Sequence, residues 1–219
     1  HGLFRDVFTG VDTRQKKAIP IGELHMLLNK DPQSEKLRRT QAIANLLFQF
    51  CGMPFSDLAH LEKSNLERGL LKYNRTKTGT PMSIEVLESA QNAIGGLYNK
   101  SDARSSGYPD YLFRILSGAY KRNEEGAYRE YQSALRRFNN ELKSLSRKLR
   151  LHSPVTSYTL RHSWATTAKY RGVPIEMISE SLGHKSIKTT QIYLKGFELE
   201  ERTRVNKLNY SYVCSFKMF

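Results

Sequence analysis

The stretch 156–196, TSYTLRHSWATTAKYRGVPIEMISESLGHKSIKTTQIYLKG, decides the fold of this chain. Thr156 or Ser157 can cap a helix from Tyr158 to about Tyr170. Arg171-Gly172 stops it, because glycine readily adopts the left-handed backbone that ends helices. A second, shorter helix follows and ends at Gly183. The stretch therefore predicts helices joined by tight glycine turns, and it carries the Arg, His and Tyr side chains that are the first candidates for chemistry.

The rest of the chain is also predicted to be mostly helical. Apolar residues recur at intervals of three and four in 35–51, which is typical of an amphipathic helix. Ser34 can cap this helix, and Gly52-Met53-Pro54 ends it. Two short helices are predicted, one after Pro20 and one that begins at Ser56 or Asp57. Longer helices are predicted for 85–94, which two glycines follow, for 122–150, with Tyr128 on its apolar side, and for 197–208.

One β-hairpin interrupts the helices. The segments 69–74 and 81–84 are predicted to pair, with their turn around Lys77-Thr78-Gly79-Thr80. A loop rich in Ser, Asp, Gly and Pro is predicted for 99–110. The fold class is therefore mainly α with a small antiparallel β-sheet (α+β).

Three regions are expected along the chain. Residues 1–19 are polar and basic, and they are interpreted as a linker from a missing N-terminal domain. Residues 20–209 are predicted to form the main domain, and residues 210–219 form a C-terminal tail.

The charge balance points to a polyanionic partner. Lys and Arg number 35 against 21 Asp and Glu, which gives a formal net charge of +14. Such an excess favours nucleic acid, because each neutralised phosphate releases condensed counterions. The basic residues are spread over several segments, which suits a surface around a DNA duplex better than a flexible arm. A generically basic protein and a membrane-surface binder are the alternatives. The longest apolar stretches are too short to cross a bilayer, and Cys51 and Cys214 have no paired spacing, so a soluble cytoplasmic protein without membrane contact is expected.

Three motifs resemble one family. The runs Leu160-Arg161-His162-Ser163-Trp164, Leu182-Gly183-His184 and Thr189-Thr190-Gln191-Ile192-Tyr193 resemble those of tyrosine recombinases, the phage integrase family, with 23 residues from Arg161 to His184 and nine from His184 to Tyr193. Gly52-Met53-Pro54-Phe55 looks like integrases of Bacteroides-type conjugative transposons. The resemblance implies a recombinase catalytic domain that cleaves and rejoins DNA without cofactor, metal or ATP, as a homo-oligomer that exchanges C-terminal helices.

The resemblance also implies roles for individual residues. Tyr193 is the expected nucleophile, and it forms a 3′-phosphotyrosine that conserves the energy for religation. Arg161 offers a planar fork of donors to two phosphate oxygens, and His184 donates a further hydrogen bond. Lys77, at the hairpin turn, is the expected general acid for the leaving 5′ oxygen.

Two positions depart from the family pattern. Tyr158 stands where a histidine is usual, and its phenol can donate to phosphate but is a poor base near neutral pH. The first arginine of the pattern is missing, because its position is occupied by Pro54 or, in an alternative alignment, by Cys51. Either Arg75 or another nearby cation substitutes for it, or the domain is slow.

Two other functions remain open at this level. One is a DNA-binding module of the same fold that has lost catalysis, which the missing arginine allows. The other is a nicking and closing enzyme like the type IB topoisomerases. A metal-dependent nuclease is disfavoured, because the sequence has no His-Glu-x-x-His motif and no obvious carboxylate cluster.

Overall fold

The computed structural model describes residues 18–98, 109–122, 124–194 and 199–215. Within these ranges the elements are, in chain order, α1 (Ile21–Asn29), α2 (Glu35–Gln49), α3 (Phe55–Ala59), the 3-10 turn η1 (Lys63–Asn65), β1 (Leu66–Glu67), β2 (Leu70–Asn74), β3 (Pro81–Glu85), α4 (Glu88–Leu97), α5 (Glu125–Lys148), α6 (Ser157–Tyr170), α7 (Ile175–Ser181), α8 (Ile187–Leu194) and α9 (Leu199–Ser215). The predicted class, mainly helical with a small antiparallel sheet, is confirmed.

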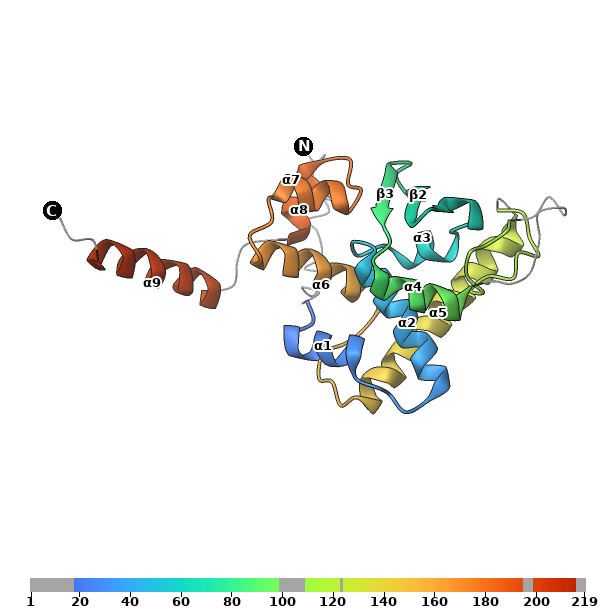
Figure 1. Ribbon diagram of the computed structural model, residues 1–219, viewed down its shortest axis with the longest axis horizontal. Coiled ribbons are helices and arrows are strands. Elements are labelled where there is room, and N and C mark those ends of the chain that lie inside the picture. Colours follow the sequence, from blue (N-terminus) through green and yellow to red (C-terminus); the bar gives the residue numbers. More distant parts are fainter. Residues whose placement is uncertain (1–17, 99–108, 123, 195–198, 216–219) are drawn as a thin grey trace, which may run out of the picture.

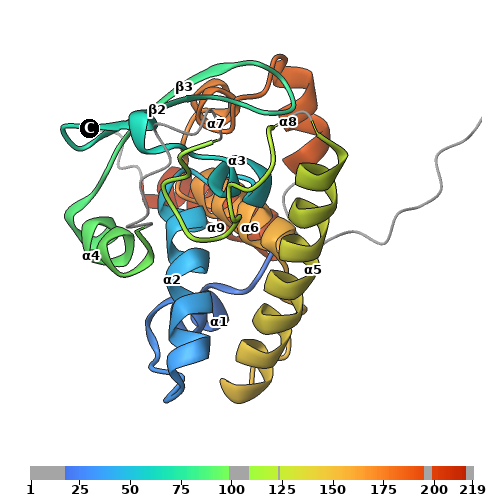
Figure 2. The same cartoon turned by 90° about the vertical axis from the view of Figure 1, so that its right-hand side faces the viewer.

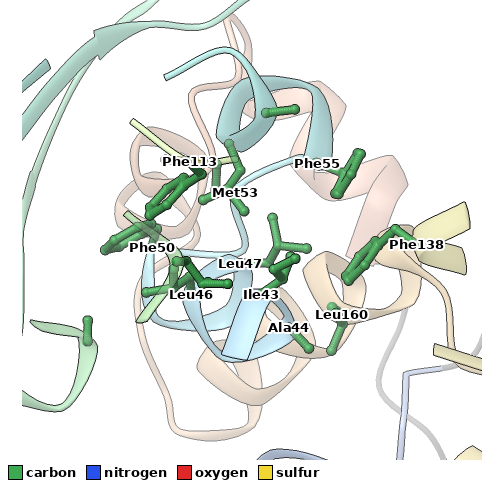
Figure 3. Close-up of a cluster of buried hydrophobic side chains, with 14 of the residues drawn as sticks. Ile43, Ala44, Leu46, Leu47, Phe50, Met53, Phe55, Phe113, Phe138 and Leu160 are labelled. Atoms are coloured by element: carbon green, nitrogen blue, oxygen red, sulfur yellow. The ribbon is translucent and has the colours of Figure 1, made fainter. Parts of the chain in front are cut away.

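The main core lies between α2, α5 and α6 (Figures 1 and 2). Leu46 and Leu47 of α2 and Leu160 of α6 are completely buried in it. The ring of Phe138 on α5 stacks on that of Phe55 at the start of α3, with centroids 4.7 Å apart (Figure 3). The apolar residues that recur at intervals of three and four on α2 and α5 thus lie in this core, and their burial supplies the main driving force for the packing.

A second, smaller core holds α8 in place. Its buried members come from α6, α7 and α8, namely Ala165, Ile178, Leu182 and Leu194, and Trp164 packs against them. The Nζ of Lys169 also donates to the carbonyl of Leu194 at 3.1 Å. These contacts fix the helix that contains Tyr193 against α6 and α7 (Figure 1).

The sheet has the order β1-β2-β3 and is antiparallel throughout. The predicted hairpin is confirmed, with Leu71 opposite Ile84 and Tyr73 opposite Met82. Leu71 and Ile84 are both buried, so this face of the hairpin packs on the core. The strand β1 was not predicted, because two residues are too short for an alternation of polar and apolar side chains to be recognised.

Several predicted helix boundaries are wrong. The hydroxyl of Thr156 does cap α6 as predicted, but the side chain of Ser34 makes no capping hydrogen bond to α2. Helix α3 starts directly after Pro54. Helix α4 starts three residues later than predicted and continues through both glycines at 95 and 96, because Leu97 is buried and anchors its last turn.

Two predictions about single segments are also corrected. Tyr128 does not lie on the apolar side of α5, since 64% of its surface is exposed. Helix α9 continues beyond the predicted end at 208, through the expected boundary at 209, to Ser215. It extends away from the rest of the molecule, and its side chains from 202 to 215 are exposed (Figure 1). The predicted loop at 99–110 lies largely outside the described residues. Among the described helices, none combines the length and apolarity that a membrane span requires.

Candidate active site

Arg161 lies at the centre of the candidate site. It belongs to α6, and only 7% of its surface is exposed. Its Nη1 donates to the carbonyl of Gly52 at 2.8 Å, and its Nη2 donates to the carbonyl of Leu182 at 2.7 Å. These two carbonyls come from the α2–α3 connection and from the end of α7. Two backbone carbonyls from separate parts of the chain thus hold the guanidinium in place.

Gly52 allows this close approach. Its φ is +64°, and an added Cβ would lie 3.2 Å from Cα of Arg161 and 3.2 Å from Cβ of Trp164. A larger residue would therefore push the α2–α3 connection away from α6. The glycine in the Gly-Met-Pro run thus serves the site through its backbone carbonyl as well as ending a helix.

His184 contacts Arg161 directly. Its Nε2 lies 3.2 Å from Nη2 of Arg161, and its Nδ1 lies 2.8 Å from the hydroxyl oxygen of Thr190 on α8. Desolvation, together with the positive charges of Arg161 and Arg75, lowers the pKa of His184 to about 4. The imidazole is therefore neutral at physiological pH.

A second buried guanidinium, that of Arg75, enters the same site from the hairpin. Arg75 follows β2, only 6% of its surface is exposed, and its Nη1 donates to the same Leu182 carbonyl that Arg161 contacts. Its Nε lies 2.7 Å from Oδ2 of Asp57 in an ion pair whose geometry is not that of an aligned hydrogen bond. Asp57 also accepts from the backbone N–H of Thr76 at 3.2 Å. The carboxylate therefore holds both the side chain and the backbone at the start of the turn.

The hairpin turn is fastened to the loop after α7. The hydroxyls of Thr78 and Thr80 each lie 3.4 Å from the carbonyl oxygen of Gly183. A Cβ added at Gly183 would lie 2.9 Å from Cγ of Arg75, so this glycine (φ +63°) is also required by close packing. Lys77 lies in this turn and is exposed. Lys77 thus lies in a turn that contacts the loop after α7, two residues after Arg75.

The remaining predicted residues lie around this centre. Tyr158 precedes Arg161 by three positions on α6, which places both on one face of the helix, and 43% of its surface is exposed. Tyr193 lies in the last turn of α8, and its side chain is outside the described part of the chain. Pro54 and Cys51 provide no cation, and burial raises the pKa of the Cys51 thiol.

Sequence reasoning missed four groups that shape this site. They are the carbonyls of Gly52 and Leu182, the carboxylate of Asp57 and the hydroxyl of Thr190. The sequence singled out Asp57 only as a possible first residue of the short helix after Pro54. Backbone carbonyls leave no trace in residue identity, and no local pattern pairs Asp57 with a residue 18 positions further along the chain.

The arrangement is suited to binding an anion. Two guanidiniums from separate elements meet at the Leu182 carbonyl, and the His184 imidazole contacts one of them, that of Arg161. Guanidinium groups match the oxygens of a phosphate. No group of three or more His, Cys, Asp and Glu side chains in the described ranges is placed to hold a metal ion.

Comparison with known proteins agrees with this architecture. The model of the phage integrase family matches residues 21–199. A probable integrase/recombinase protein of Methanocaldococcus jannaschii is 28% identical over 204 residues, which cover 90% of this chain and 58% of that protein. The tyrosine recombinase XerD of Halalkalibacterium halodurans is 30% identical over 190 residues, which cover 82% of this chain and 57% of that protein.

Solved structures show the same fold. The crystal structure of XerA recombinase superposes with a TM-score of 0.63 at 21% identity, over 92% of this chain and 66% of that one. The Tn1549 transposon integrase in complex with circular intermediate DNA superposes with a TM-score of 0.56 at 15% identity, over 90% of this chain and 68% of that one. The chain spans somewhat more than half the length of the curated relatives that it matches.

Proposed function

Because the chain belongs to the phage integrase family of tyrosine recombinases, we propose that it cleaves and rejoins DNA strands as a site-specific recombinase. The observation that carries this proposal is the meeting of Arg161, Arg75 and His184 beside α8, the helix that contains Tyr193. Tyr193 is the proposed nucleophile. Its phenolic oxygen attacks the scissile phosphorus and forms a 3′-phosphotyrosine, while the phenolic proton is released to water and the bond to the 5′ oxygen breaks. Attack by a 5′ hydroxyl reverses the step and needs no ATP.

The two guanidiniums stabilise the charge that develops on the phosphate. In the absence of DNA they donate to neutral carbonyls, and a phosphate oxygen is a stronger acceptor for them. Arg75 supplies the cation that Pro54 and Cys51 do not. Support for this comes from its burial, its shared acceptor with Arg161 and its ion pair with Asp57, which holds it in the site. Of the two outcomes that the sequence left open, these contacts favour substitution by Arg75 over a slow domain.

Lys77 and Tyr158 complete the proposed site. Lys77 protonates the leaving 5′ oxygen, and the Thr78 and Thr80 contacts to Gly183 support its placement at the rim. A substrate whose 5′-bridging oxygen is replaced by sulfur tests this role, because a thiolate leaves without protonation. Lys77→Ala should be slow on the oxygen substrate and close to wild type on the sulfur substrate. Equal defects on both substrates would contradict the role. Tyr158, on the same helix face as Arg161, donates a further hydrogen bond to the phosphate.

Double-stranded DNA is the proposed partner, and the formal net charge of +14 supports it. Related folds have been solved as a lambda integrase dimer bound to a core site and as XerH bound to its difH substrate. By analogy this chain acts as a homo-oligomer on DNA, with α9 docked on a neighbouring copy through Val205 and Leu208, whose side chains are 44% and 55% exposed. Removal of residues from 197 onward should abolish cooperative assembly on DNA, and an unchanged oligomer would count against this docking.

The proposed domain organisation follows from the membership of the chain in the phage integrase family. Residues 20–209 form most of the proposed catalytic domain, but both expected bounds need correction. Ile19, expected in the linker, is buried in the main core and its backbone N–H donates to Ser163 at 2.8 Å, and the expected end at 209 falls inside α9. The residues before Ile19 are proposed to lead from an upstream domain that clamps the other side of the duplex. Such an enzyme acts on DNA in the cytoplasm. Its likeness to integrases of Bacteroides-type conjugative transposons stays a prediction.

Covalent trapping tests the proposed function. The substrate is an attachment site, read from the genomic context, with a nick close to the cleavage point, so that the released fragment cannot religate. The wild-type chain should form a covalent complex, and Tyr193→Phe should bind the same DNA without forming one. If both bind and neither is trapped, the chain is a DNA-binding module. Relaxation of supercoiled DNA without joining of two duplexes would instead indicate a topoisomerase-like enzyme.

A further inference from the structure

Thr190 connects the imidazole of the site to the helix of the proposed nucleophile. It lies on α8 one turn before Tyr193, and its surface is completely buried. Its Oγ1 lies 2.8 Å from Nδ1 of His184. Because α8 is itself fixed by Leu194 in the small core and by the contact of Lys169 with its last carbonyl, this hydrogen bond sets the position of the ring relative to α8.

Two contacts of His184 favour one tautomer of its ring. A guanidinium only donates hydrogen bonds, so at the 3.2 Å contact with Nη2 of Arg161 the acceptor is Nε2 of the ring. The single proton of the neutral imidazole is therefore on Nδ1, where it is donated to Oγ1 of Thr190. In this state Nε2 has no hydrogen to offer to a phosphate.

Donation to a phosphate requires the other tautomer. Nε2 can donate only if it carries a proton, and a second proton on the ring is opposed by the two cations that face it, Arg161 and Arg75. The ring can instead stay neutral, gain a proton from water at Nε2 and release the one at Nδ1 to water. Nδ1 then needs a donor, and a hydroxyl can serve as donor or acceptor by rotation of its hydrogen.

We infer that Thr190 is a positioning residue that holds His184 as the Nδ1–H tautomer in the free protein and, by reversing its hydrogen bond, as the Nε2–H tautomer when a phosphate oxygen replaces Arg161 at Nε2. This inference rests on the proposed function, because it assumes that the anion in the site is a scissile phosphate. Thr190 thus makes a reversible hydrogen bond to His184 that neither valine nor alanine could make.

Nitrogen-15 NMR of the His184 ring in the full chain tests the first half without DNA. The free wild-type chain should show a protonated Nδ1 and an unprotonated Nε2 at neutral pH. Thr190→Val, which keeps the shape but loses the hydroxyl, should show a mixture of tautomers, and Thr190→Ser should resemble wild type. Thr189→Val is the matched control, because Thr189 is the exposed neighbour on the same helix. A dominant Nε2–H tautomer or a doubly protonated ring in the wild type would overturn the inference, and this measurement needs no variant to fold.

Single-turnover cleavage of the nicked substrate tests the second half. Thr190→Val should cleave about tenfold more slowly, the size expected when a buried polar group loses its partner. Thr190→Ser should recover most of the rate, and Thr189→Val should match wild type. A Thr190→Val chain that folds, binds DNA and cleaves at the wild-type rate would overturn the inference. Absence of cleavage by the wild type would instead refute the proposed function. The tautomer measured in the free chain would still test the first half of the inference independently.

Discussion

Replacement of Asp57 and Arg75, singly and together, separates the structural role of this ion pair from its proposed chemical role. The two side chains are almost fully buried, with 1% and 7% of their surfaces exposed, and Nε and Oδ2 are 2.7 Å apart. Asp57→Asn keeps the shape and removes the negative charge. Arg75→Met keeps much of the side-chain volume and removes the positive charge. The double variant removes both charges.

Stability and activity should respond in different patterns. Each single variant leaves one buried charge without its partner, and loss of one member of such a pair lowers the free energy of unfolding by about 3–5 kcal/mol. The double variant leaves no isolated charge, so its loss should be much smaller than the sum of the two. Cleavage should fall about 10²–10³-fold whenever Arg75 is absent, by analogy with loss of one oxyanion donor. Asp57→Asn, which retains the guanidinium, should cleave faster than either variant that lacks it.

Urea denaturation and single-turnover cleavage of the nicked substrate measure the two quantities on the same four chains. DNA binding by gel shift serves as the control for folding. The reasoning predicts that the double variant recovers stability without recovering cleavage. Recovery of both would refute it, because Arg75 would then serve only to neutralise Asp57, and the cation missing at Pro54 would have no replacement in the hairpin.

Three further predictions concern the surroundings of the site. The pKa of His184 is about 4 in the folded chain against 6.5 for a free histidine, so the unfolded chain binds this proton first and folding stability should fall as the pH drops from 6.5 towards 4. Urea midpoints across this range should fall less steeply for His184→Gln, and equal slopes would show that the ring is not desolvated. Gly183→Ala should lower cleavage by displacing Arg75, since the new Cβ would lie 2.9 Å from its Cγ and 2.7 Å from Sδ of Met82 at a φ of +63°. An unchanged single-turnover rate would contradict this packing. Phe138→Ala should lower the free energy of unfolding by about 3–5 kcal/mol, because a ring stacked on Phe55 leaves a cavity. The exposed control Tyr128→Ala should change it by less than about 0.5 kcal/mol, and similar losses for both in urea denaturation would contradict the assigned burial.

Much of the fold was readable from local patterns. Helices α2 and α5 were predicted because their apolar residues recur with the helical period, and α6 was predicted from its cap residue and the glycine that follows it. Each prediction needed only neighbours in the chain. The hairpin was predicted from its turn residues for the same reason. Helix α4 was misjudged because burial of Leu97, a tertiary effect, extends the helix through two glycines that locally disfavour it.

The sequence by itself determined which residues were candidates, since motif and spacing singled out Arg161, His184 and Tyr193. It also established that the first arginine of the pattern is absent. Only the tertiary structure decided that Arg75 lies beside Arg161, because this depends on an ion pair with Asp57 and on a hairpin fastened to the Gly183 loop more than a hundred residues away. Long-range contacts of this kind arise from packing between elements, and packing is not encoded in any local pattern of residues.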